Sequence, residues 1–149
     1  MINRPVVLHL FSTQHGVASI EQLRALPVSM DAIQRARTKG TVVNILPGIV
    51  RLAGTEESFA SRAIALQLHL GSESFISGTS AGVLHGLRNM PRQPVEITAG
   101  QGRRVTMPEW GRLEYTSWID VERDVHLRPD GLRVASPLRM LFRLARTFN

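Results

Sequence analysis

Two short helix patterns separated by only two residues constrain the fold of this chain more than any other feature. The patterns cover residues 19–26 and 29–39, and each begins with a serine. Serine is favoured before a helix because its hydroxyl accepts a hydrogen bond from an unpaired backbone N–H, and Gln22 completes a capping box with Ser19. Because only the dipeptide Pro27-Val28 lies between them, the two helices must meet at a sharp angle. The sequence therefore predicts a helix-turn-helix.

The segments on either side of this helix pair fit the same fold. A further helix pattern covers residues 6–15, with Val7, Leu8, Leu10 and Phe11 expected to face inward. Gly40 ends the second helix of the pair, where a residue in the left-handed conformation costs least. Two Val- and Ile-rich strand patterns, residues 42–46 and 49–52, then predict a β-hairpin. Helices followed by such a hairpin form a winged helix-turn-helix, which we expect over residues 1–54.

The outer face of the second helix of the pair carries side chains suited to DNA. At about 100° per residue, four side chains fall on a face that packs inward, Met30, Ala32, Ile33 and Ala36, and polar residues fall on the opposite face. Gln34 and Arg35 are among these, and their residue types make bidentate contacts with adenine and guanine. The alternative is a solvated helix face without a partner. The candidate DNA-contacting residues are Ser29, Asp31, Gln34, Arg35, Arg37, Thr38, Lys39 and Arg51.

The composition fits a nucleic-acid partner and excludes several kinds of site. The net charge is +6, and 17 of the 18 basic residues are arginines, which bind phosphate and guanine edges through planar pairs. A GC-rich genome would raise the arginine content in the same way. Without cysteine there is no disulfide or zinc–thiolate site, which fits a cytoplasmic protein. The histidines lack metal-binding spacing, no P-loop is present, and no apolar run reaches the length of a membrane span, so we expect no metal, cofactor or membrane contact.

Residues 55–149 predict a small mixed α/β domain. Helices are expected from Thr55 and over residues 80–87, and strands over residues 75–76, 95–99, 113–117 and 132–135. The loop over residues 100–104 lacks the third glycine of a dinucleotide site, and we interpret it as a hairpin loop. Ser136-Pro137 begins a last helix. One face of that helix is lined by Leu138, Leu141, Phe142, Ala145 and Phe148. Because this apolar helix ends with the sequence, we expect the domain to be truncated relative to a longer protein.

Residues 78–82 match the G-x-S-x-G pattern of a serine-hydrolase nucleophile elbow. Asp130 would then supply the acid of a patatin-like dyad. However, no glycine-rich oxyanion loop lies upstream, and the residues before the motif fit a winged helix instead. The other interpretation is a helix start, with Ser77 or Thr79 as its cap and small residues that allow close packing. We therefore expect Ser80 to be structural and the chain not to be an enzyme, with serine hydrolysis as an alternative.

Taken together, the motifs resemble the abortive-infection antitoxin family AbiEi over nearly the whole chain. The matching stretches are His15-Gly16-Val17, Gln22-Leu23, Gly40, Gly48-Ile49-Val50, residues 76–81, His85-Gly86-Leu87, residues 94–98, Asp130-Gly131-Leu132 and Ser136-Pro137. The resemblance implies a winged-helix DNA-binding domain and autoregulation of an operon. It also implies, as part of a type IV toxin–antitoxin system, neutralisation of a nucleotidyltransferase-like toxin without stable binding. The chain departs from the family at Val50, where an aromatic residue is usual, and at Pro27, where a glycine is more typical.

We therefore expect an α+β chain that combines an N-terminal winged helix-turn-helix with a small mixed α/β domain. The expected function is that of a cytoplasmic, antitoxin-type transcriptional regulator that binds double-stranded operator DNA as a homodimer. Because some members of the resembled family continue into a Vsr-like endonuclease domain, the main alternative is a DNA-targeting or structural module of a larger nuclease.

Overall fold

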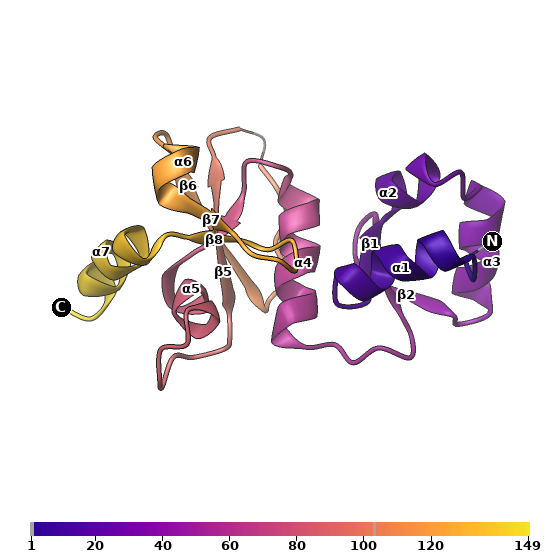
Figure 1. Ribbon diagram of the computed structural model, residues 1–149, viewed down its shortest axis with the longest axis horizontal. Coiled ribbons are helices and arrows are strands. Elements are labelled where there is room, and N and C mark those ends of the chain that lie inside the picture. The colour runs from indigo at the N-terminus through magenta and orange to yellow at the C-terminus, as the bar shows by residue number, and fades with distance from the viewer. Residues whose placement is uncertain (1, 103) are drawn as a thin grey trace. The chain divides into compact units, whose positions relative to one another are not determined.

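The computed structural model describes residues 2–102 and 104–149, which form seven α-helices and two β-sheets (Figure 1). The predicted α+β class is therefore confirmed. The chain divides into two compact units, Met1–His69 and Leu70–Asn149. This division falls later than residue 54, where the composition changes, and the domain boundary expected there stays a prediction. Arg103, part of the loop interpreted as a hairpin, lies outside the described residues.

The first unit contains a three-stranded sheet and four helices. In chain order its elements are α1 (Pro5–Thr13), β1 (Val17–Ser19), α2 (Ile20–Ala25), α3 (Met30–Thr38), β2 (Val42–Leu46), β3 (Ile49–Leu52) and α4 (Phe59–Leu70), whose last residue lies beyond the unit. The sheet order is β1-β3-β2, and both neighbouring pairs are antiparallel. The hairpin β2–β3 has the predicted bounds. Strand β1 was absent from the sequence prediction because three residues are too few to show a strand period.

Local hydrogen bonds explain why α2 and α3 begin and end where they do. The Ser19 hydroxyl accepts from the Gln22 N–H at 3.0 Å, and the Gln22 side chain accepts from the Ser19 N–H at 3.0 Å, so the predicted capping box is confirmed. The Ser29 hydroxyl caps α3 by accepting from the Ala32 N–H at 3.1 Å. Beyond α3, Gly40 has a φ of +74°, which a residue with a Cβ rarely adopts.

The core of the first unit brings one face of α1, α2 and α3 against the sheet. Its fully buried side chains include Val7 and Phe11 from α1, Leu23 from α2 and Ile33 from α3. The interpretation that Leu8 also faces inward is wrong, because its side chain is 43% exposed. Residues four apart share one face of a helix, and Val7 and Phe11 form the buried face of α1, from which Leu8 points away.

The second unit contains a five-stranded sheet. Its elements are β4 (Phe75–Ile76), α5 (Gly78–Leu84), β5 (Val95–Gly100), β6 (Gly111–Thr116), α6 (Val121–Asp124), β7 (Val125–Leu127), β8 (Arg133–Ala135) and α7 (Pro137–Thr147). The sheet order is β6-β5-β4-β8-β7, with β5–β6 and β4–β8 parallel and the other pairs antiparallel. Within the described residues, no helix is both long and apolar enough to cross a membrane.

Two expectations about connections are wrong. Because β5 and β6 are parallel, the segment between them is a crossover connection and not a hairpin loop. The helix expected from Thr55 begins at Phe59 instead. At its start, the Ser58 N–H donates to the Ser61 hydroxyl at 2.8 Å, and the Ser61 N–H donates to the Ser58 hydroxyl at 3.1 Å. Thr55 lies against Gly16, where an added Cβ would be 2.7 Å from the Thr55 Cβ.

The last helix begins as predicted but buries a different face. The Ser136 hydroxyl accepts from the Arg139 N–H at 3.3 Å, and Pro137 occupies the first turn. Met140 and Leu144 are the buried residues of α7. The apolar side chains on the face identified in the sequence are more than half exposed: Leu138, Leu141, Phe142 and Phe148.

Candidate nucleic-acid interface

Helix α3 is held to the first unit through small side chains. Ala32, Ile33 and Ala36 are its buried residues, and two of the three are alanines, so the helix backbone can approach its neighbours closely. Val28, before the Ser29 cap, is 1% exposed and belongs to the same core cluster as Ile33, which agrees with the staple spacing. The expectation that Met30 also packs inward is wrong, because Met30 is 43% exposed at the first position of α3. The rest of α3 faces solvent.

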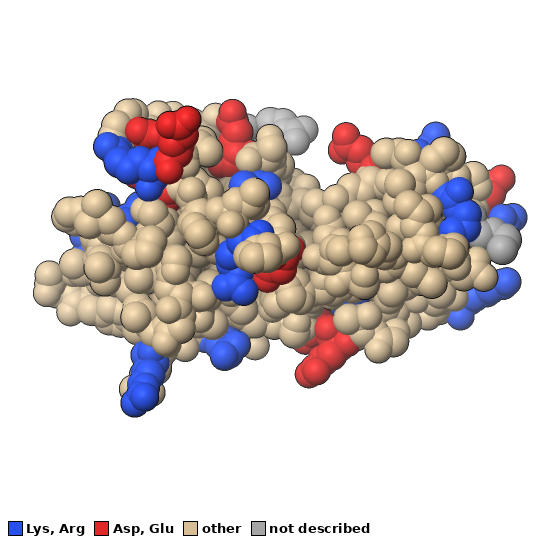
Figure 2. All heavy atoms as spheres, viewed as in Figure 1, with Lys and Arg blue, Asp and Glu red and all other residues tan. Residues whose placement is uncertain are grey.

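The polar residues predicted to contact DNA lie on that surface. The exposed members are Ser29, Asp31, Gln34, Arg35, Thr38 and Lys39. Arg35 and Lys39, one helical turn apart, also line a groove of about 320 Å³ whose other lining residues include Leu8 of α1 and Leu52 of β3. Lys and Arg side chains gather at the end of this unit where α3 is labelled (Figures 1 and 2). The arrangement can present amide and guanidinium groups to the base edges in a DNA groove, and positive charge to the phosphates that border it.

The other two candidate arginines are held by the protein itself. The Arg37 Nε donates to the Asn44 Oδ1 at 3.1 Å and so ties α3 to β2. One Arg51 Nη donates to the carbonyl oxygens of Leu52, at 3.1 Å, and Thr55. The Arg51 side chain is half-buried, and its Nε has no partner among the described residues. The Arg37 side chain therefore leaves α3 on the side of β2, and Arg51 lies on β3, so neither side chain is on the outer face of α3.

Asn44 is a residue of this surface that sequence reasoning missed. It is exposed on β2 and orients Arg37. A strict strand alternation would place Asn44 on the buried face with Val42 and Leu46. Asn44 is exposed instead, because the pairing of β2 with β3 shifts register between Asn44 and Leu46 and the alternation is lost there. No other pattern in the sequence distinguishes it.

The G-x-S-x-G motif forms the first five residues of α5, directly after Ser77, in the second unit. Ser80 is fully buried, and its hydroxyl accepts from the Glu96 N–H at 2.8 Å. The Glu96 carboxylate accepts from the Thr79 N–H at 2.8 Å. His85 points elsewhere, with its Nε2 2.7 Å from the carbonyl oxygen of Ala135. The serine hydroxyl therefore joins helix α5 to strand β5 at a site without solvent contact.

Neither metal ligands nor relatives add to this description. Across residues 2–102 and 104–149, no group of three His, Asp or Glu side chains lies close enough to hold a metal ion. No protein-family model matches the chain, and no curated protein sequence matches it either. The candidate interface therefore rests on the geometry of α3 and its neighbours.

Proposed function

We propose that the first unit is a winged helix-turn-helix that binds double-stranded DNA, with α3 in the major groove and the β2–β3 hairpin as the wing. The observation that carries this proposal is the rigid, capped α3, which projects Gln34, Arg35 and Thr38 outward from a buried alanine face. The element order α1-β1-α2-α3-β2-β3, with β3 of the wing paired to β1, supports it. A helix of this kind reaches base edges through its N-terminal and outward residues.

The proposed roles follow from the chemistry of each side chain. Gln34 and Arg35 pair with adenine and guanine edges, and Asp31, in the first turn, is placed to accept from a cytosine amino group. Lys39, at the end of α3, binds backbone phosphate and contributes affinity without sequence preference. Arg37, oriented by Asn44, does the same from the wing side.

The wider role is an antitoxin-type transcriptional regulator that works in the cytoplasm as a dimer on its operator. Its link to a nucleotidyltransferase-like toxin, without a stable complex, comes from the resemblance of the motifs to AbiEi antitoxins. We also propose that the chain is not an enzyme. The complete burial of Ser80 and the hydrogen bond that its hydroxyl accepts from the Glu96 N–H support a structural role for the motif.

Fluorescence anisotropy with labelled duplexes tests the proposal. The full chain is titrated with DNA from upstream of its own gene and with a scrambled duplex of equal length, at several salt concentrations. We expect tighter binding of the upstream duplex, and an affinity for both that falls linearly in log–log form with salt. Absence of binding to either duplex at low salt would overturn the proposal.

A further inference from the structure

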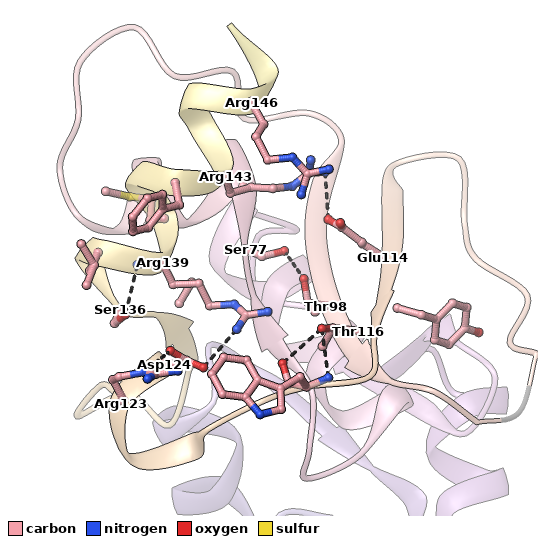
Figure 3. Close-up of a pocket in the computed structure, with 17 residues that line it drawn as sticks. Ser77, Thr98, Glu114, Thr116, Arg123, Asp124, Ser136, Arg139, Arg143 and Arg146 are labelled. Carbon is pink, nitrogen blue, oxygen red and sulfur yellow. Dashed lines mark hydrogen bonds and ion pairs between the residues drawn. The ribbon is translucent and has the colours of Figure 1, made fainter. Parts of the chain in front are cut away.

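A pocket of about 490 Å³ lies in the second unit, outside the proposed DNA surface (Figure 3). Its walls come from α7, from β6 and the segment after it, and from α6, and Ser77 and Thr98 lie deep within it. These two buried hydroxyls are joined by a hydrogen bond of 2.7 Å. The volume falls in the range of pockets that hold small organic molecules, about 300–1,000 Å³.

Positive charge exceeds negative charge around this pocket. Four arginines and two carboxylates line it: Arg123, Arg139, Arg143, Arg146, Glu114 and Asp124. Asp124 pairs with Arg123 at 3.2 Å and with Arg139 at 3.1 Å, and Glu114 pairs with Arg143 at 2.9 Å. Two positive charges are therefore left without a matching carboxylate among the lining residues.

The ionisation of Asp124 determines the net charge of the pocket lining near neutral pH. Burial works to raise the pKa of Asp124. The hydrogen bond from Arg123, the Asp120 backbone N–H and the charges of Arg123 and Arg139 outweigh that effect, so the pKa lies below its ordinary value. Asp124 is therefore ionised wherever the protein is near neutral pH, and its two arginines stay oriented.

The group formed by Arg123, Arg139 and Asp124 carries one of these two charges, and the end of the pocket near Glu114 carries the other. Arg143 and Arg146 lie close together there, on the same side of α7 and near Glu114 (Figure 3). The Arg143 Nη2 meets Glu114, but its Nε is buried and has no hydrogen-bond partner among the described residues. Arg146 has no ion pair within the described part of the chain. Like charges at this helical spacing repel, and an anion between them would remove the repulsion.

Apolar and aromatic side chains line the rim of the pocket. Trp118 is 65% exposed, Phe142 69% and Leu138 61%, and all three line the pocket. Large apolar side chains gathered at the mouth of a cavity mark a surface that is covered when a ligand binds. Two of the three are aromatic. The Arg123 guanidinium lies over one face of the Trp118 ring, 4.8 Å from its centroid, so Trp118 offers its other face to a planar ring.

We propose that this pocket binds a nucleoside monophosphate, with the phosphate held by Arg143 and Arg146 and the base against Trp118 and Phe142. A phosphate monoester carries about −1.5 to −2 charges at pH 7, which matches the excess of two positive charges among all the residues that line the pocket. Arginine also fits phosphate through two parallel N–H donors. The pocket and its ligand are independent of whether the first unit binds DNA.

Isothermal titration calorimetry of the full chain tests the proposal with AMP, GMP, CMP and UMP, with adenosine and with inorganic phosphate. We expect at least one of the four nucleotides to bind at least tenfold more tightly than either adenosine or phosphate. Arg146→Ala should weaken that binding about tenfold. Trp118→Ala should weaken it as well, whereas Glu114→Gln should strengthen it because a competing negative charge is removed.

The matched control is Arg88→Ala, since Arg88 is an exposed arginine of the same unit that does not line the pocket. It should leave nucleotide binding unchanged. The proposal is overturned if no nucleotide binds at millimolar concentration, if adenosine binds as tightly as AMP, or if Arg146→Ala and Arg88→Ala behave alike. Binding of a 5′-phosphorylated oligonucleotide without binding of any mononucleotide would also overturn it.

Discussion

Replacing Gly78 with alanine probes the tight turn between β4 and α5, on which the polar network of the second unit depends. Gly78 has a φ of +57°, in the left-handed region. A Cβ at this position would overlap the Glu96 Oε2 and lie 2.8 Å from its Cδ. The substitution therefore imposes a strained backbone and displaces the carboxylate that accepts from the Thr79 N–H.

These two effects set the expected loss in the free energy of unfolding. Holding a residue other than glycine in the left-handed region costs about 1–2 kcal/mol. A hydrogen bond to a charged group contributes about 1.5–3 kcal/mol, and displacement of Glu96 removes one such bond. We therefore expect Gly78→Ala to lower the free energy of unfolding by about 2.5–5 kcal/mol.

Urea denaturation followed by tryptophan fluorescence measures this loss, because both tryptophans, Trp110 and Trp118, lie in the second unit. Gly86→Ala is the matched control: Gly86 has a φ of +81° and no atom within 4 Å of an added Cβ, so only the backbone cost applies. In a Glu96→Ala background, Gly78→Ala should cost no more than this control. The reasoning fails if Gly78→Ala and Gly86→Ala are equally destabilising, or if Gly78→Ala costs the same in both backgrounds.

Three further predictions concern single side chains. Arg35→Ala should cost roughly 1–3 kcal/mol on the preferred duplex and relax the preference at one base pair, whereas Lys39→Ala should weaken all duplexes alike and reduce the salt slope by about 1, both measured by anisotropy. Ser80→Ala should lower the free energy of unfolding by about 1–3 kcal/mol, because the Glu96 N–H loses its acceptor, and should leave DNA binding intact. Labelling of Ser80 by a fluorophosphonate probe would contradict the structural role. Asp124 has a lowered pKa in the folded chain, so its stabilisation is complete above its unfolded pKa and is lost as pH falls through the lower folded value. Asp124→Asn should therefore be less stable than the wild type at pH 7, with a difference that shrinks below about pH 4 in urea titrations.

Features set by neighbouring residues were predictable from the sequence. The caps at Ser19, Ser29 and Ser136 each depend on a residue three positions later, and all three are present. The parallel pairing of β5 with β6 depends on which strands meet in the sheet, and no local pattern records that choice. The register shift in β2 has the same origin, since it exists only relative to β3.

The candidate site also combines features that the sequence predicts with features that only the folded chain sets. Helical periodicity correctly placed Gln34 and Thr38 on the exposed face of α3. It could not show that Arg51 is held by backbone carbonyls, because these partners are fixed by the fold of the segment after β3. The arginines of α7 are visible in the sequence at helical spacing. Their partner Glu114 and the aromatic rim at Trp118 come from other segments, and only the folded chain brings them together.

Selection of bound duplexes from a random-sequence pool tests the central claim, recognition of DNA by α3, most directly. The full chain and its Arg35→Ala variant are each taken through the selection and the enriched sequences are compared. We expect the wild type to enrich one motif that contains a G·C pair, and the variant to lose its preference at that pair while keeping the rest. Enrichment of no motif by the wild type, or of an identical motif by the variant, would contradict recognition through α3.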